Sequence, residues 1–364
     1  MSLREQWRQA RPPVLGAHLD SAACSRQSVE TIRAVAQHAE HEAQIGGYVA
    51  QEAATPVLDA GRAAVRQLTG MTEAQVQFTT GAADALRTLL QGWPADAGRT
   101  IACLPGEFGP NLMIMHHFGF TPVWLPVDGD GRADVDGIEA FLRREKVDLV
   151  HFTVVGSHRG TVQPAAQVVA LARAAGVPVV VDAAQALGHI DCTHGADAMY
   201  APSRKWLAGP RGVGVLAINP ALAHVIPQWA GHIEAHVAGW VGLSVAVGQH
   251  LAAGPAQVQA ALAERGRSAR KILGELKDWR VVESVDEPSA ITTLEPVGDV
   301  DVIAVRARLI EEHAIVTTGA ETIRAPFEMT KPVLRISPHV DGTDEELELV
   351  AAALRAQSVR SISV

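Results

Sequence analysis

The chain has 364 residues, of which 48% are hydrophobic and 20% charged, and its formal net charge is −9 at pH 7. This acidic balance, without a basic arm, argues against general attraction to nucleic acid or to anionic lipid, so we expect no nucleic-acid partner and no membrane partner. The three cysteines, Cys24, Cys103 and Cys192, are far apart and form no C-x-x-C pair, which predicts neither a disulfide framework nor a metal site and favours a reducing cytoplasm.

Helices are predicted before the first strand. Residues 1–15 mix charge with proline and lack the apolar segment of a signal peptide, and no apolar run approaches roughly 18 residues, so we expect a cytoplasmic protein.

Apolar residues recur at helical spacing over 28–42 and 55–68. Gly46-Gly47 separates the two helices, and Tyr48 follows this break.

From residue 76 onward, strands and helices alternate. Apolar and β-branched runs predict strands at 76–80, 100–104, 122–126, 148–155, 177–181, 198–201 and 215–218. Helical spacing predicts helices at 84–91, 136–144 and 165–175. Such alternation implies βαβ units, so we expect an α/β fold with a mostly parallel central sheet.

The pattern changes after Pro220. Long helical stretches are expected at 237–253 and 256–277, then strands near 281–283, 290–295, 314–318 and 333–337, with helices at 300–313 and from Asp344 onward. This order predicts a large domain over 16–254 and a small α+β domain over 255–364, on which residues 1–15 pack.

Reactive side chains follow two of the predicted strands. The run 177–181 ends at Asp182, and the strand 198–201 is followed by Ser203 and Lys205. Carboxyl ends of neighbouring strands meet at one edge of an open sheet, where ligands bind. An acid, a hydroxyl and a lysine at one edge suit pyridoxal 5′-phosphate (PLP), which needs an amine for a Schiff base, an anion at its ring nitrogen and donors for its phosphate.

A second anion site is expected where the strand 76–80 passes through Gly81, Ala82 and Ala83 into the helix 84–91. Free backbone N–H groups and the helix dipole both point at a ligand in such a turn. An ordinary turn has the same composition, so this signal is weak by itself.

The pattern D-x-x-Q at 182–185, with S-x-K at 203–205, resembles the class V aminotransferase and cysteine desulfurase family, whose members are PLP enzymes of fold type I. The resemblance implies PLP as cofactor, a homodimer, and catalytic roles for Lys205 and Asp182. Lys205 would form the Schiff base, and Asp182 would hold the ring nitrogen.

The resemblance also implies further contacts with the cofactor and the substrate. Ala82 and Ala83 would bind the PLP phosphate through backbone amides, as would Ser203 through its hydroxyl. Phe108 would stack on the ring in place of the usual histidine, while Ser157 and Gln185 would approach its phenolate oxygen. In the substrate site, Arg335 of the L-R-x-S motif would bind the α-carboxylate, and Tyr48 is available for the side chain.

Several of these residues also have ordinary structural interpretations. Asp182 could cap a helix, Phe108 could belong to the core, Ser157 could cap a loop and Arg335 could form a surface ion pair.

Two departures from the family pattern narrow the function. Desulfurases carry a loop cysteine in the C-terminal domain, and the matching region 317–331 has none, which disfavours a persulfide mechanism. The segment 233–242 is shortened and lacks the threonine that reaches the phosphate of the neighbouring subunit in relatives. Arg204, where relatives usually have histidine, is therefore expected to bind the phosphate, with His236 as a weaker substitute.

Over its full length the sequence is similar to the carbon–sulfur lyase branch of this family, which completes ergothioneine biosynthesis. That resemblance implies β-elimination of hercynylcysteine sulfoxide to give ergothioneine, pyruvate and ammonia. An aminotransferase or an epimerase of the isopenicillin N type, acting on another amino acid, remains the alternative within the family. A PLP-binding or partner-binding protein without catalysis is the alternative outside the enzymes.

Overall fold

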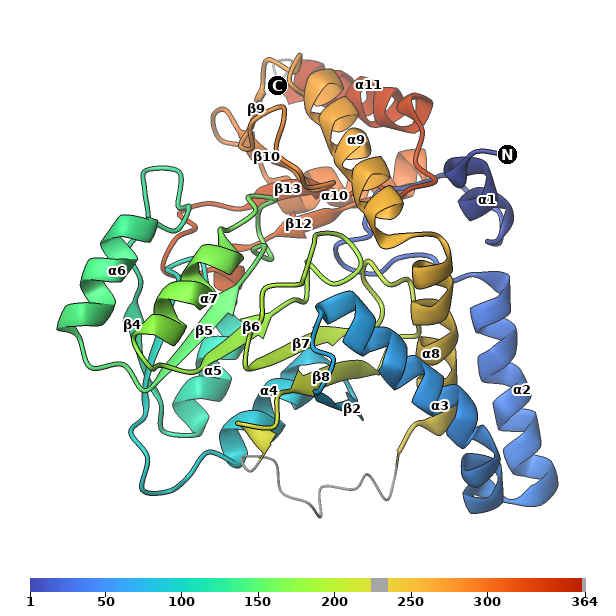
Figure 1. The fold of residues 1–364 in the computed structure, drawn as a ribbon. Coiled ribbons are helices and arrows are strands. Elements are labelled where there is room, and N and C mark those ends of the chain that lie inside the picture. The colour runs from blue at the N-terminus through green and yellow to red at the C-terminus, as the bar shows by residue number, and fades with distance from the viewer. Residues whose placement is uncertain (224–234, 362–364) are drawn as a thin grey trace.

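A seven-stranded sheet forms the centre of the computed structural model, which describes residues 1–223 and 235–361, without the side chains of 357–361 (Figure 1). Its order is β2-β8-β7-β6-β5-β3-β4. The strands are β2 (Gln75–Thr79), β3 (Thr100–Cys103), β4 (Thr121–Trp124), β5 (Leu149–Thr153), β6 (Val179–Asp182), β7 (Ala198–Pro202) and β8 (Gly214–Ile218). Among these seven strands β8 alone runs opposite to the others, so the predicted mostly parallel α/β sheet is confirmed.

Helices cover both faces of this sheet. One face packs against α4 (Ala82–Gln91) and α5 (Gly109–His117), and the other against α3 (Gly47–Thr69), α6 (Val135–Arg144), α7 (Ala165–Ala174) and α8 (Val237–Ala252). Side chains of β6 alternate between the two cores, since Val179 and Val181 face one and Val180 the other. Helix α2 (Val29–Ile45) packs on α3 and α8. Burial on both faces explains the continuous apolar runs of the strands.

Two helices differ from the prediction. Helix α5 was not predicted, because its exposed face carries the apolar Met113 and its buried face the polar Asn111, so the sequence shows no amphipathic spacing. Helix α3 begins at Gly47 instead of residue 55, with Pro56 inside it. Pro56 is exposed, and the helix continues through it.

A second layer is built by the C-terminal part. Its antiparallel sheet has the order β12-β13-β10-β9. The strands are β9 (Trp279–Val281), β10 (Thr292–Pro296), β12 (Thr318–Ala320) and β13 (Val333–Ile336), and the helices are α9 (Pro255–Leu273), α10 (Val302–His313) and α11 (Asp344–Ser361). This layer has its own apolar core, which includes Leu273, Leu294, Leu309 and Leu334.

The N-terminal segment contacts this second layer. In α1 (Leu3–Gln9), Trp7 stacks on His339 with ring centroids 4.9 Å apart, and Arg8 pairs with Glu346 at 2.9 Å. Strand β1 (Ala17–His18) pairs with β11 (Ile315–Val316). These contacts agree with packing of the N-terminus on the C-terminal part, while the exact division at residues 16 and 254 stays a prediction.

Among the described residues, no single helix is long and apolar enough to cross a membrane, although α8 and α9 pass that test as a pair bent by 86°. Most residues of α8 are buried in the protein.

Candidate active site

A pocket opens at the carboxyl edge of the large sheet, where ligands bind in open α/β folds. Its volume is about 420 Å³, within the usual range for a small-molecule site. The lining comes from the ends of β5 and β6, the turns after β2 and β7, the start of α4, and the loop between β12 and β13. The polar and charged residues that line it are Thr80, Asn111, Thr153, Ser157, Asp182, Gln185, Arg204, Lys205, Arg211 and Arg324.

Lys205 lies in a tight turn directly after β7. The amide of Ala208 donates to the Lys205 carbonyl at 2.9 Å, and Ala208 has a positive φ of 54°, which is uncommon for a residue with a side chain. The next residue, Trp206, is fully buried, and its indole donates to Gln185 at 2.9 Å. The backbone that carries Lys205 is therefore held firmly, while its side chain reaches the pocket.

The surroundings of Lys205 favour a neutral amine. Burial lowers the pKa of Lys205 to about 7, since the nearby carboxylate of Asp182 offsets only part of this effect and Arg204, Arg335 and Arg324 lower it further. A large share of the amine is thus unprotonated at neutral pH. An unprotonated lysine is the form that attacks carbonyl groups and accepts protons.

Asp182 is fixed opposite this amine at the end of β6. Its Oδ1 accepts the backbone N–H of Ala184 at 2.7 Å, and its Oδ2 accepts Asn111 at 2.9 Å and the Tyr200 hydroxyl at 3.1 Å. Three donors on one buried side chain suit an ionised carboxylate. Asp182 can therefore serve as a fixed acceptor for a cationic N–H group.

The N-terminus of α4 forms the other end of the pocket. Its N-cap, Gly81, has φ 151° and no capping side chain, and Ala82 and Ala83 line the pocket. Gly214 allows β8 to approach this turn, since a Cβ there would lie 2.9 Å from the Gly81 Cα. Uncapped N–H groups at the start of a helix bind anions such as phosphate.

Positive charge dominates the lining. Three arginines, Arg204, Arg211 and Arg324, surround the pocket, and Asp182 is the one acid among its described lining residues. Such a balance favours a ligand with several negative charges, such as a phosphate together with a carboxylate.

Most predicted site residues lie at this pocket. Ala82, Ala83, Phe108, Ser157, Asp182, Gln185, Arg204 and Lys205 all line it. The Ser157 hydroxyl is buried and has no hydrogen-bond partner among the described residues, so it is free for a ligand. The Gln185 amide nitrogen donates to the Ala22 carbonyl at 2.8 Å, and its oxygen accepts from Trp206, so the side chain is held at both ends.

Four predicted contacts lie away from the lining, and their roles stay predictions: Ser203, Arg335, Tyr48 and the weaker candidate His236. Ser203 is buried, and its hydroxyl donates to the Pro210 carbonyl at 2.7 Å. Arg335 is fully buried behind the pocket, where it donates to the Ser157 carbonyl and lies 3.6 Å from Asp20. Tyr48 is 74% exposed at the start of α3.

Other lining residues were missed by the sequence analysis. Arg211 lies in the glycine-rich turn after Lys205, and Asn111 lies one helical turn after Glu107, so both could have been found by tracing the neighbourhood of the motifs. Arg324 comes from a short 3-10 helix, Thr322–Arg324, in the second layer. It has no local signal, because only the tertiary fold brings it to the pocket.

These features fit PLP. The neutral buried lysine, the fixed acid, the uncapped helix and the cationic lining match its aldehyde, its ring nitrogen and its phosphate. Fold and pocket together define a PLP-dependent enzyme of fold type I. The family described as Aminotransferase class-V matches residues 17–350, and the chain belongs to that family.

Relatives and solved structures agree with this placement. A probable hercynylcysteine sulfoxide lyase of Mycobacterium tuberculosis (strain CDC 1551 / Oshkosh) is 55% identical, over 98% of this chain and 93% of that protein. A probable cysteine desulfurase of Vibrio cholerae is 26% identical over 93% and 92%. A cysteine desulfurase from Escherichia coli has the same fold, with a TM-score of 0.83, 21% identity and 98% of each chain covered. The cystine C-S lyase C-DES has a TM-score of 0.83 at 18% identity, over 93% and 97%.

Proposed function

We propose that this protein is a PLP-dependent carbon–sulfur lyase that cleaves hercynylcysteine sulfoxide in ergothioneine biosynthesis. The observation that carries the proposal is the 55% identity, over 98% of this chain, to a protein named as a probable hercynylcysteine sulfoxide lyase. A pocket with Lys205 and Asp182 in place supports an active enzyme.

The loop between β12 and β13 argues against a desulfurase. Residues 317–331 contain no cysteine that could accept sulfur from a substrate. The same region supplies Arg324 to the pocket, a cation that can bind an anionic group of the substrate but cannot carry a persulfide. Sulfur therefore leaves with the rest of the substrate.

Each residue of the pocket has a separate role in β-elimination. When bound, PLP withdraws electrons from the Cα of an amino acid joined to it. Asp182 would hold the ring nitrogen, and the backbone amides of Ala82 and Ala83, with Arg204, would bind the phosphate. Lys205, whose pKa is lowered to about 7 by burial, takes the Cα proton on its Nζ.

Electrons and atoms balance in the reaction. The electron pair of the Cα–H bond forms a double bond between Cα and Cβ, and the Cβ–S bond breaks, so the sulfur leaves as a sulfenic acid. Water converts the three-carbon fragment to pyruvate and ammonia. A thiol reductant outside the protein then supplies two electrons to convert the sulfenic acid to the thione of ergothioneine.

The test is a panel of cysteine S-conjugates and their sulfoxides, incubated with purified enzyme while pyruvate is measured. We expect pyruvate in equal amount to the sulfur product, and fastest turnover for hercynylcysteine sulfoxide. Keto-acid formation from an added amino donor, or racemisation without pyruvate, would instead identify an aminotransferase or an epimerase.

We also propose a twofold homodimer, the commonest closed assembly of soluble enzymes. Exposed apolar side chains gather around the turn between α2 and α3, including Ile45, Tyr48 and Val49, and such a cluster favours a partner surface. Tyr48 would then contact substrate from this surface. Sedimentation that gives a fully active monomer would refute the dimer.

Arg204 gives a prediction about PLP retention. The shortened segment after Ala235 removes a hydroxyl donor that relatives have, and Ala83 removes another. The Arg204 guanidinium lines the pocket and can replace them with charge-assisted hydrogen bonds of roughly 1.5–3 kcal/mol each. We expect Arg204→Ala to weaken PLP binding by about ten-fold to a hundred-fold, measured by equilibrium dialysis.

Arg204→His should recover only part of this affinity, because a mostly neutral imidazole offers fewer donors. Arg143→Ala, on the exposed face of α6, is the matched control. The idea is wrong if Arg204→Ala keeps PLP through dialysis as well as the wild type. The residues Ile233 and Glu234 of the shortened segment lie outside the described residues.

A further inference from the structure

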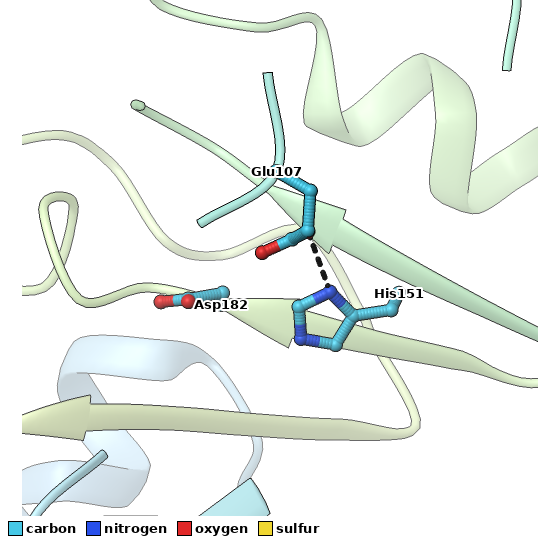
Figure 2. Close-up of side chains that lie close together, drawn as sticks. All are labelled: Glu107, His151 and Asp182. Atoms are coloured by element: carbon cyan, nitrogen blue, oxygen red, sulfur yellow. Dashed lines mark hydrogen bonds and ion pairs between the residues drawn. The ribbon is translucent and has the colours of Figure 1, made fainter. Parts of the chain in front are cut away.

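Behind Asp182, a chain of buried polar side chains crosses the sheet from β3 to β7. Figure 2 shows Glu107, His151 and Asp182 side by side. His151 Nδ1 lies 2.9 Å from Glu107 Oε2, and His151 Nε2 lies 2.7 Å from the Tyr200 hydroxyl. That hydroxyl donates to Asp182 Oδ2 at 3.1 Å. The chain therefore ends on the carboxylate that faces the pocket.

Register places these groups together. Asp182 is paired with Tyr200 across β6 and β7, and with Thr153 across β5 and β6. His151, two residues before Thr153, points to the same face of the sheet. Glu107 and His151 are both fully buried, so solvent takes no part in these contacts.

The hydrogen bonds around His151 favour a proton on both of its ring nitrogens. Glu107 already accepts the Phe108 amide and Asn111 at 2.8 Å each and Thr153 at 3.1 Å, so as a carboxylate it receives the Nδ1 proton as well. The single Tyr200 hydroxyl proton points to Asp182, so its oxygen accepts from Nε2. Both ring nitrogens then carry protons.

The electrostatic balance agrees. Burial disfavours a charged imidazole, but the adjacent carboxylate of Glu107, with its hydrogen bond, and the charge of Asp182 outweigh burial and raise the pKa of His151. For Glu107, burial is likewise outweighed, chiefly by His151 and Asn111, and the pKa is lowered. The other titratable groups nearby are the Cys103 thiol beside Glu107 and the Lys205 amine beyond Asp182.

The three side chains have the residue types of a metal site, with ligand atoms within 4.8 Å of one another. However, the Asn111 amide donates to both Glu107 and Asp182, and the Tyr200 hydroxyl lies between His151 and Asp182. Donor hydrogens thus point at the oxygens that a cation would need. We therefore interpret the cluster as a hydrogen-bond network and not as a metal site.

We propose that His151 is a permanent imidazolium that acts through Tyr200 to keep Asp182 ionised and oriented toward the ring nitrogen of PLP. Glu107 holds the charge on His151, and Asn111 holds Glu107 and Asp182 together. His151, Tyr200 and Glu107 are positioning residues, since they touch neither the cofactor nor the substrate. The proposal rests on the proposed function for its link to PLP.

The first test uses Tyr200→Phe, which removes only the hydroxyl, and the double variant Glu107→Gln/His151→Gln, which removes both charges together. PLP affinity is measured on folded apoenzyme between about pH 5 and 9. We expect the affinity for PLP to fall about ten-fold at neutral pH. We also expect the acid limb of the profile, the pH range over which affinity is lost on acidification, to move upward by about one pH unit. A merely structural role would leave that limb in place.

His250→Leu is the matched control, because His250 is also buried but has no hydrogen-bond partner among the described residues, and burial lowers its pKa to about 4. Its acid limb should coincide with that of the wild type.

The second test is nitrogen NMR of histidine-labelled apoprotein at about pH 8, where an ordinary imidazole is neutral. We expect one doubly protonated ring that is absent in the double variant. Only neutral rings, or acid limbs that coincide in all variants, would overturn the proposal. A wild type that takes up no PLP would refute the proposed function instead, while the NMR signal would still decide the charge on His151.

Discussion

Replacing Lys205 with alanine should abolish the visible absorbance of lysine-linked PLP and lower pyruvate formation by roughly 10³-fold. The variant loses both the amine that bonds to the cofactor and the base that takes the Cα proton, and a positioned base alone contributes about 10²–10⁴-fold. Absorbance spectra and turnover of purified proteins measure both effects. Borohydride should fix PLP on the wild-type peptide that carries Lys205, as detected by mass spectrometry.

Lys331→Ala is the control, since Lys331 is half-exposed and pairs with Glu295 at 3.3 Å away from the pocket. It should keep full absorbance and turnover. Normal turnover in Lys205→Ala, or a borohydride adduct on another lysine of the wild type, would show that the assignment is wrong.

The same lysine predicts how the stability of the apoprotein depends on pH. Burial lowers the pKa of Lys205 to about 7, whereas in the unfolded chain it is near 10.4. Below about pH 7 folding buries an ammonium at full cost, and above about pH 10 it buries a neutral amine. This lysine therefore makes the free energy of unfolding rise with pH between these limits. Denaturant unfolding should show that Lys205→Met loses this part of the slope.

Asp182→Asn should lower turnover by roughly 10²–10³-fold while the protein stays folded. The substitution keeps the size of the side chain and an oxygen acceptor for Asn111 and Tyr200. It removes the negative charge, so a protonated ring nitrogen would be buried without its counter-charge, a cost of about 3–5 kcal/mol in comparable buried pairs. Pyruvate kinetics with saturating PLP measure the loss.

Asp136→Ala, at the exposed first turn of α6, is the control and should behave as the wild type. Circular dichroism separates loss of chemistry from loss of fold. If Asp182→Asn turns over within a few-fold of the wild type, this carboxylate does not hold the ring nitrogen.

Local patterns predicted the parts of the site that lie at the ends of elements. Asp182 at the end of β6, Lys205 after β7 and Gly81 before α4 each follow an apolar run, and parallel strands bring such ends to one edge. The mostly parallel main sheet also followed from the alternation of strands and helices. Helix α5 did not, because its exposed face carries the apolar Met113 and its buried face the polar Asn111.

What the sequence did not reveal depends on register and on long-range packing. In the sequence, His151 is one more residue of a buried strand. Only its contacts with Tyr200 and Glu107 indicate a positioning role. Arg324 reaches the pocket from a separate layer. Arg335 contacts Ser157 and Asp20, a placement that its motif did not reveal, and its role toward the substrate stays a prediction. No local propensity encodes these placements.

The charge imbalance of the pocket has a consequence for the lifetime of the protein in a cell. Three arginines around a single carboxylate repel one another until an anionic ligand joins them. Binding to the folded state alone stabilises it by mass action, by about 4 kcal/mol when the ligand is at a thousand times its dissociation constant. Chains made when vitamin B6 is scarce would spend more time unfolded and be degraded sooner. The abundance of this enzyme should therefore follow the vitamin supply, even at constant rates of synthesis.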